Sequence, residues 1–339
     1  RSRKPTTRPR PMSPREFQPR GLLRNPHVQS ILASSPVRRW KFRARHRVLE
    51  ARSRELILDC GDGVRLQGFH AAQDVLPEAR GLVVLLHGWE GSAQSSYMLN
   101  VGARLLVEGY DVFRLNLRDH GDTHHLNEAV FHSCRIDEVV GAVANVAQRF
   151  PTRPLAIAGF SLGGNFALRV ALRAPARGID LSKVVAVCPA VRPINILVEL
   201  ERRRVYHDYF MRKWRESLRR KQQLFPGRYP LGPDIYKLDM RGLTQELILR
   251  ETDFGTLEAY FDGYAIHEGR LADLSVPGAI LMAKDDPIIP VDDFATLQLP
   301  PHVQLDLTDH GGHCGFIRDW SLHSWAEDYL VAQLAETRR

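Results

Sequence analysis

The stretch LAIAGFSLGGNFALRVAL, residues 155–172, decides the fold class of this chain. It opens with an apolar run typical of a buried strand and closes with apolar residues at helical spacing. Between them, Gly159-Phe160-Ser161-Leu162-Gly163 fits the pattern G-x-S-x-G, in which a tight turn lifts a serine hydroxyl above a sheet at a helix N-terminus. A chance glycine-serine turn has no reason to lie between a strand and a helix. We therefore predict that Ser161 is a nucleophile.

On both sides of this stretch, the chain alternates between predicted strands and helices. Strands are predicted at 56–58, 66–69, 81–86, 112–117, 155–158, 184–187, 279–283 and 303–307, and helices at 97–107, 136–150, 162–172 and 322–334. Such alternation is typical of an α/β fold with a mostly parallel central sheet and helices on both faces. The first two strands flank Gly61-Asp62-Gly63 and are expected to form a hairpin.

The alternation breaks over residues 194–275, which contain charged segments with helical spacing and no convincing strand. We expect a helical cap inserted into the α/β core. The expected organisation is a basic, flexible arm at 1–20, a first core segment at 21–193, the cap at 194–275 and a second core segment at 276–339.

Composition excludes several classes of protein. The 339 residues are 44% hydrophobic and 25% charged, which is unlike a disordered or collagen-like chain. No apolar run approaches the roughly 20 residues of a membrane-spanning helix. The four cysteines lie far apart without a C-x-x-C pair, which favours free thiols in a reducing compartment. We therefore expect a cytoplasmic protein.

The charge is concentrated near the start of the chain. Residues 1–54 hold 16 Lys and Arg against two acids, Glu16 and Glu50, while the whole chain carries +8, so the remainder sums to −6. We favour a solvated arm over residues 1–20, with weak contact to an anionic membrane surface as the alternative. No aromatic-interleaved motif accompanies the arm, so no nucleic-acid partner is expected.

A nucleophilic serine needs a base and an acid that orients the base, in the chain order Ser, acid, His. Asp285 and Asp286 follow a late predicted strand, and we choose Asp286, directly before a proline, as the acid, because Asp285 is better placed to brace the turn. His310 and His313 share the loop after the last predicted strand. We choose His313, which Gly312 and Gly315 flank, and expect a structural role for His310.

The oxyanion of an acyl-transfer intermediate needs two backbone donors. The N–H of Leu162 follows the nucleophile, and the second donor is expected from the loop after the first central strand. That loop reads His87-Gly88-Trp89-Glu90-Gly91-Ser92, and Gly88 lets the backbone turn inward. We predict that the N–H of Trp89 is the second donor and that its side chain walls the acyl pocket.

Four histidines, His120, His124, His125 and His132, gather with Asp119 and Asp122 after another strand of the predicted sheet. These residue types could hold a metal ion. We favour hydrogen-bonded loop residues at the pocket entrance, because nothing in the spacing makes the side chains converge. The Ser-His-Asp chemistry itself requires no cofactor or metal.

Five segments together resemble the YheT-like group, or AB hydrolase 4 family, of the α/β-hydrolase superfamily. They are NPHVQSIL at 25–32, HGWEGS at 87–92, GFSLGGN at 159–165, AKDDP at 283–287 and HGGHCGFI at 310–317. The resemblance runs from Phe17 to the terminal helix. It implies an α/β-hydrolase fold that begins near Phe17, and a catalytic triad of Ser161, Asp286 and His313.

The expected function is that of a serine carboxylesterase, extending to lipase-like action on short- or medium-chain acyl esters. Its partner would be a small-molecule or lipid ester. An acyltransferase or thioesterase would use the same three side chains, so these alternatives stay open. A non-catalytic lipid- or nucleic-acid-binding protein is disfavoured, because nucleophile, base, acid and oxyanion loop are all present in the sequence.

Overall fold

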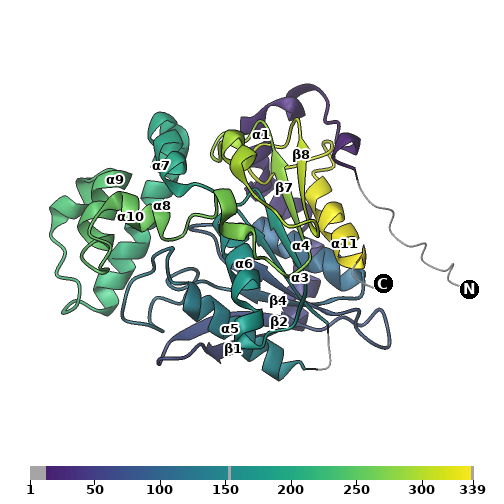
Figure 1. Cartoon of the computed structure of the whole chain (residues 1–339), viewed down its shortest axis with the longest axis horizontal. Helices are drawn as coiled ribbons and strands as arrows, with labels where there is room; N and C mark the ends of the chain where they lie inside the picture. The colour runs from purple at the N-terminus through teal and green to yellow at the C-terminus, as the bar shows by residue number, and fades with distance from the viewer. Residues whose placement is uncertain (1–12, 152–153, 337–339) are drawn as a thin grey trace, which may run out of the picture.

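A computed structural model describes residues 13–151 and 154–336 of the chain (Figure 1). Its centre is one eight-stranded sheet in the order β1-β2-β4-β3-β5-β6-β7-β8. β1 and β2 pair antiparallel, β2 pairs antiparallel with β4, and the other neighbours are parallel. The strands are β1 (Ser53–Asp59), β2 (Arg65–Ala71), β3 (Leu82–Leu86), β4 (Asp111–Leu115), β5 (Leu155–Phe160), β6 (Leu181–Val187), β7 (Gly278–Ala283) and β8 (Val303–Thr308). The predicted α/β class, the early hairpin and the strand order along the chain are confirmed.

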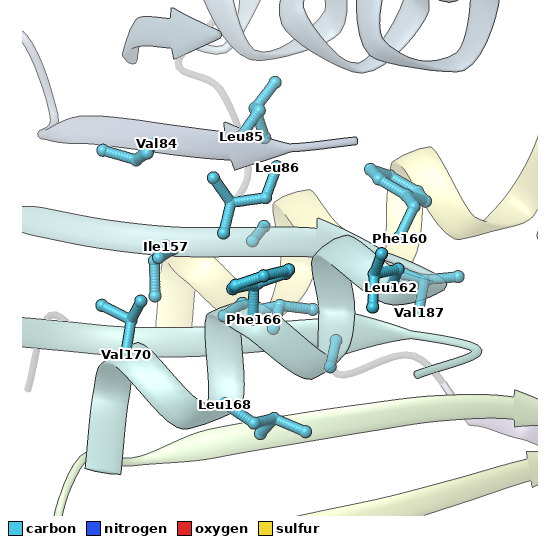
Figure 2. Close-up of a cluster of buried hydrophobic side chains, with 14 of the residues drawn as sticks. Val84, Leu85, Leu86, Ile157, Phe160, Leu162, Phe166, Leu168, Val170 and Val187 are labelled. Atoms are coloured by element: carbon cyan, nitrogen blue, oxygen red, sulfur yellow. The ribbon is translucent and has the colours of Figure 1, made fainter. Parts of the chain in front are cut away.

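Helices cover both faces of this sheet. α4 (Ser96–Val107) packs with α11 (Trp325–Glu336), whereas α5 (Ile136–Arg149) packs with α6 (Leu162–Arg173). The crossovers through α4 and α5 run in opposite directions along the sheet, so right-handed connections place these helices on opposite faces. Figure 2 shows one such layer, with Phe166 of α6 lying near Leu86 of β3 and Ile157 of β5. All five residues of β3 are buried, as expected for a central strand with both faces covered.

The insertion between β6 and β7 is helical. It contains α7 (Pro193–Arg202), α8 (Arg204–Leu224), α9 (Met240–Leu243), a π-helical turn at Thr244–Ile248 and α10 (Leu257–Asp262). Residues 194–275 are all described and contain no strand. In Figure 1, α9 and α10 project from the sheet at the end opposite α11. We call this insertion the cap.

Three short helices, which the sequence did not reveal, precede the sheet. They are α1 (Pro26–Ala33), α2 (Pro36–Lys41) and α3 (Arg43–Arg52). The side chain of Asn25 caps α1 by accepting from the N–H groups of His27 and Val28. Ahead of them, Phe17 is only 3% exposed and its ring lies 5.7 Å from that of Trp325.

The folded part of the chain therefore begins before residue 20, where we expected the flexible arm to end. Residues 1–12 lie outside the described residues, but the segment around Phe17 packs into the core. A starting point near Phe17 is what the family resemblance implied, and charge alone did not locate it.

The terminal helix also begins later than expected, at Trp325 and not at 322. Leu322 has a φ of 61°, which a helix cannot contain, and Ser324 forms a β-bridge with Ile317. All four cysteines carry free thiols. Within the described parts of the chain, no helix has the length and apolar character that a membrane crossing requires.

Candidate active site

Ser161 lies in a sharp turn between β5 and α6. Its φ of 54° and ψ of −122° are strained for a residue with a side chain. The flanking glycines are required by close approach, because a Cβ on Gly159 would lie 2.0 Å from the carbonyl oxygen of Gly163. A Cβ on Gly163 would likewise lie 2.4 Å from the carbonyl oxygen of Leu86. The turn thus sets Ser161 at the N-terminus of α6 beside the end of β3.

Asp286 and His313 form a buried pair on the loops after β7 and β8. Asp286 Oδ2 lies 2.8 Å from His313 Nδ1, while Asp286 Oδ1 accepts from the N–H groups of Ile288 and Ile289. Burial by itself lowers the pKa of His313, but the charge of Asp286, the neighbouring Cys314 and the hydrogen bond with Asp286 outweigh it and raise the pKa to about 9. Since Nδ1 is bound to Asp286, Nε2 is the ring nitrogen left for other chemistry.

A second pair of the same residue types lies beside the first. His310 Nδ1 is 3.4 Å from Asp285 Oδ2, and Asp285 Oδ1 accepts from the N–H of Gly312 at 2.8 Å. Burial raises the pKa of Asp285. The partner side chain, His310, is 32% exposed. Asp285 therefore braces the backbone of the histidine loop, and its contact with His310 is long.

The histidine loop rests on α1. The N–H of His313 donates to Ser30 Oγ at 2.8 Å, and Ser30 Oγ donates to the carbonyl of Pro26. The amide of Gln29 is fully buried and exchanges two hydrogen bonds with the backbone of Ile317. Reasoning from the sequence found no role for these residues, although they lie in the 25–32 segment that carries the family resemblance.

The loop after β3 passes directly beside the nucleophile, since a Cβ on Gly88 would lie 3.2 Å from Ser161 Cβ. His87 fixes the base of this loop. Its Nε2 accepts from the N–H of Leu117, so its Nδ1 donates to the carbonyl of Gly88. Burial holds the pKa of His87 well below its ordinary value, so the ring is neutral.

The cap holds the same loop from the other side. The indole of Trp89 stacks on Phe210 of α8 at 5.2 Å and meets the edge of Trp214 at 5.5 Å. Lys213, also on α8, donates from Nζ to the carbonyl of Glu90 at 2.8 Å. One face of the cap helix thus positions the loop that carries Trp89.

A cavity lies between the core and the cap, with Ser161, Leu162 and Trp89 in its wall. Its empty volume, including its mouth, is about 820 Å³. Apolar side chains of the cap form much of the lining: Ile196, Leu197, Leu200, Phe210, Trp214, Met240 and Ile248. The space beside the serine is therefore largely apolar.

The histidine cluster is held by separate contacts. His120 Nδ1 donates to the carbonyl of Arg118, and His124 Nε2 lies 2.7 Å from Ser217 Oγ. Burial lowers the pKa of His120 to about 4 and contributes most to lowering that of His124 and of His132 to about 3. The two nearby acids have cationic partners from α8, Asp119 with Lys221 and Asp122 with Arg220. These residues tie the loop to the cap, and only His132 of the four histidines borders the cavity.

Comparisons with known proteins agree with this architecture. A sequence model described as "Alpha/beta hydrolase family" matches residues 83–321. The chain is 28% identical over 340 residues to "Putative esterase YheT" of Escherichia coli (strain K12), covering 94% of each protein. It is 24% identical to "Phospholipase ABHD3" of Mus musculus, covering 73% of this chain and 61% of that one.

Solved structures share the fold at low sequence identity. The Pyrococcus furiosus esterase Pf2001 aligns with a TM-score of 0.57 and 17% identity, over 86% of this chain and 92% of that one. A bacterial membrane phospholipase A aligns with a TM-score of 0.56 and 18% identity, over 92% and 93%.

Proposed function

Because the chain belongs to the alpha/beta hydrolase family, and to its YheT-like group, we propose that it is a carboxylic ester hydrolase that works through Ser161, His313 and Asp286. The observation that carries the proposal is the buried Asp286–His313 pair, which leaves His313 Nε2 available, combined with the strained serine turn at the cavity wall. The named esterase and phospholipases among the relatives support the choice of carboxylic esters.

In the proposed first step, Ser161 Oγ attacks the ester carbonyl carbon while His313 Nε2 takes its proton. Asp286 keeps the proton on Nδ1 and stabilises the imidazolium that forms. The N–H groups of Leu162 and Trp89 receive the oxyanion. Leu162 is the first residue of α6, where backbone N–H groups lack intrahelical acceptors.

In the second step, the tetrahedral intermediate collapses and the alcohol leaves with the proton from His313. Water then attacks the acyl-enzyme, with His313 again acting as base, and the carboxylic acid is released. These steps use only groups of the chain and the water that is consumed.

The apolar lining favours an ester with a medium-length acyl chain. Each buried methylene contributes roughly 0.8 kcal/mol, or about fourfold in kcat/KM, while the chain still fits. In a series of p-nitrophenyl esters, we expect kcat/KM to rise from acetate to octanoate. A series that falls steadily beyond acetate would contradict this substrate class without contradicting the triad.

The test of the proposal is labelling with a fluorophosphonate probe, read as intact mass. The wild type should gain one adduct and Ser161→Ala none, with both proteins folded by circular dichroism. Ser133→Ala serves as the matched control, because Ser133 also borders the cavity and lies outside the proposed triad. Equal labelling of Ser161→Ala and wild type, or ester turnover by Ser161→Ala, would contradict the proposal.

A further inference from the structure

Two tryptophans are exposed on one surface near the start of the fold. Trp40 of α2 is 67% exposed and Trp320, in the loop before α11, is 60% exposed. They come from distant parts of the sequence, but Lys41 Nζ donates to the carbonyl of Trp320 at 3.2 Å, so the two segments touch. Val37, one turn before Trp40 on α2, is 61% exposed. Large apolar side chains grouped in this way are uncommon on a surface that contacts only water.

Exposed cations surround these apolar side chains. Arg39, Lys41, Arg43 and Arg45 are all exposed, and the guanidinium of Arg43 lies 4.7 Å from the centre of the Trp40 ring. None of these four forms a salt bridge with a carboxylate in residues 13–151 and 154–336. We call Val37, Trp40, Trp320 and these four cations the tryptophan–cation surface.

The acids that would oppose this charge are few. Residues 17–54 contain ten Lys and Arg and a single acid, Glu50. Asp319 precedes Trp320, and its carboxylate accepts from the N–H of Ser321. The remainder of the chain after residue 54 is net negative. An anionic surface would therefore attract the part of the molecule that residues 17–54 form.

We propose that the tryptophan–cation surface docks on the face of an anionic lipid bilayer. Indole rings favour the boundary between headgroups and acyl chains, where their apolar body is buried and the N–H stays hydrated. Lys and Arg around them pair with anionic headgroups. Nucleic acid would engage the cations but offers no apolar layer for Val37 and two projecting indoles, so a bilayer is the better fit.

Docking of this surface would be connected to the candidate active site through α1, which directly precedes α2 in the chain. α1 contacts α2 on one side and supports the His313 loop on the other, and His27 Nδ1 lies 2.9 Å from Tyr206 Oη of the cap. The proposal stands without the esterase function, because binding to vesicles is measured without turnover.

The test uses the full chain with vesicles of phosphatidylcholine alone or mixed with 30% phosphatidylglycerol, in a sedimentation assay. We expect binding to the mixed vesicles only, weakening as salt is raised. Each basic residue near the surface contributes about fivefold to the affinity, so Lys41→Glu with Arg43→Glu should weaken binding by at least ~25-fold. The matched control is Arg204→Glu with Arg250→Glu, the same charge change on exposed cap residues.

A second variant tests insertion of the indoles. In the wild type, brominated lipid should quench part of the tryptophan fluorescence, and Trp40→Ala with Trp320→Ala should lose that quenching while Trp89, Trp214 and Trp325 still report the fold. Equal binding by the Lys41/Arg43 variant and its control would overturn the proposal. So would tighter binding to duplex DNA than to mixed vesicles, or quenching unchanged in the tryptophan variant.

Discussion

The two neighbouring aspartate–histidine pairs contain the same side chains but differ in burial and contact. Asp286 and His313 meet at 2.8 Å with the carboxylate side chain fully buried, whereas Asp285 and His310 meet at 3.4 Å with both side chains partly exposed. In the first pair, both carboxylate oxygens have short partners that hold the acid against the ring. In the second, the shorter hydrogen bond goes to the backbone of Gly312.

The difference shows that one position along a loop decides whether a carboxylate holds a histidine ring or braces a turn. Asp286 reaches His313 because the backbone N–H groups that follow it fix its carboxylate. Asp285 points to the loop that carries His313 and holds its shape. We therefore expect the first pair to govern chemistry and the second to govern loop geometry.

The largest expected effect separates the two histidines. His313→Ala should lower kcat by roughly 10⁶-fold, because the serine loses its base. His310→Ala should lower kcat less than about threefold, because a long, partly exposed contact contributes little. Steady-state kinetics on a p-nitrophenyl ester measures both. Comparable losses in the two variants would mean that the pairs do not differ in role.

The next effect separates the two acids. Asp286→Asn should lower kcat by about 10⁴-fold, since the amide no longer favours the required tautomer and charge of His313. Asp285→Asn should cost less than ~10-fold, because the asparagine oxygen can still accept from the N–H of Gly312. If Asp285→Asn proved the more damaging, the acid would have to be reassigned.

The pH profile sharpens the comparison further. In the proposed mechanism, His313 acts as a base only when neutral, and its pKa is raised to about 9, so kcat/KM should increase with pH up to about 9. Asp286→Asn removes the charge that raises this pKa, so the midpoint should move to lower pH. Asp285→Asn should leave the midpoint unchanged. A midpoint that moves in both variants would show that the two pairs titrate as one unit.

The smallest effect concerns the support beneath the first pair. Ser30→Ala leaves the N–H of His313 without its acceptor, which costs about 1–2 kcal/mol of unfolding free energy. We expect kcat to fall about threefold to tenfold and Tm to fall by about 2–4 °C. Ser34→Ala, the same change at the exposed end of α1, should leave kcat unaltered. Thermal unfolding by circular dichroism and ester kinetics provide the two readings.

Much of the fold was predictable because its signals are local. The strands around β3 to β8 are apolar runs bounded by turns, and the serine turn is fixed by glycines that steric contact demands. The order of acid and histidine follows the strands that carry them. Residue-level choices between Asp285 and Asp286 could be reasoned from the proline that follows, but their distances could not.

The unpredicted parts depend on contacts between distant segments. α1 and α2 are short, and Leu23 just before α1 and Arg38 of α2 are buried against the loop before α11. The contact of Lys213 with Glu90 joins the cap to the loop beside Ser161 across 123 residues. Neither contact leaves a periodic pattern in the sequence, which is why both escaped the sequence analysis.

The pairing of Gln29 with Ile317 has a consequence for biosynthesis. These residues are 288 positions apart, so the ribosome makes them about 15–60 s apart at roughly 5–20 residues per second. During that interval, the loop that carries His313 and Ile317 has not yet been made, so α1 cannot contact it. Only a nascent chain that already includes Ile317 can join α1 to the histidine loop, so translation itself delays the final assembly of the site.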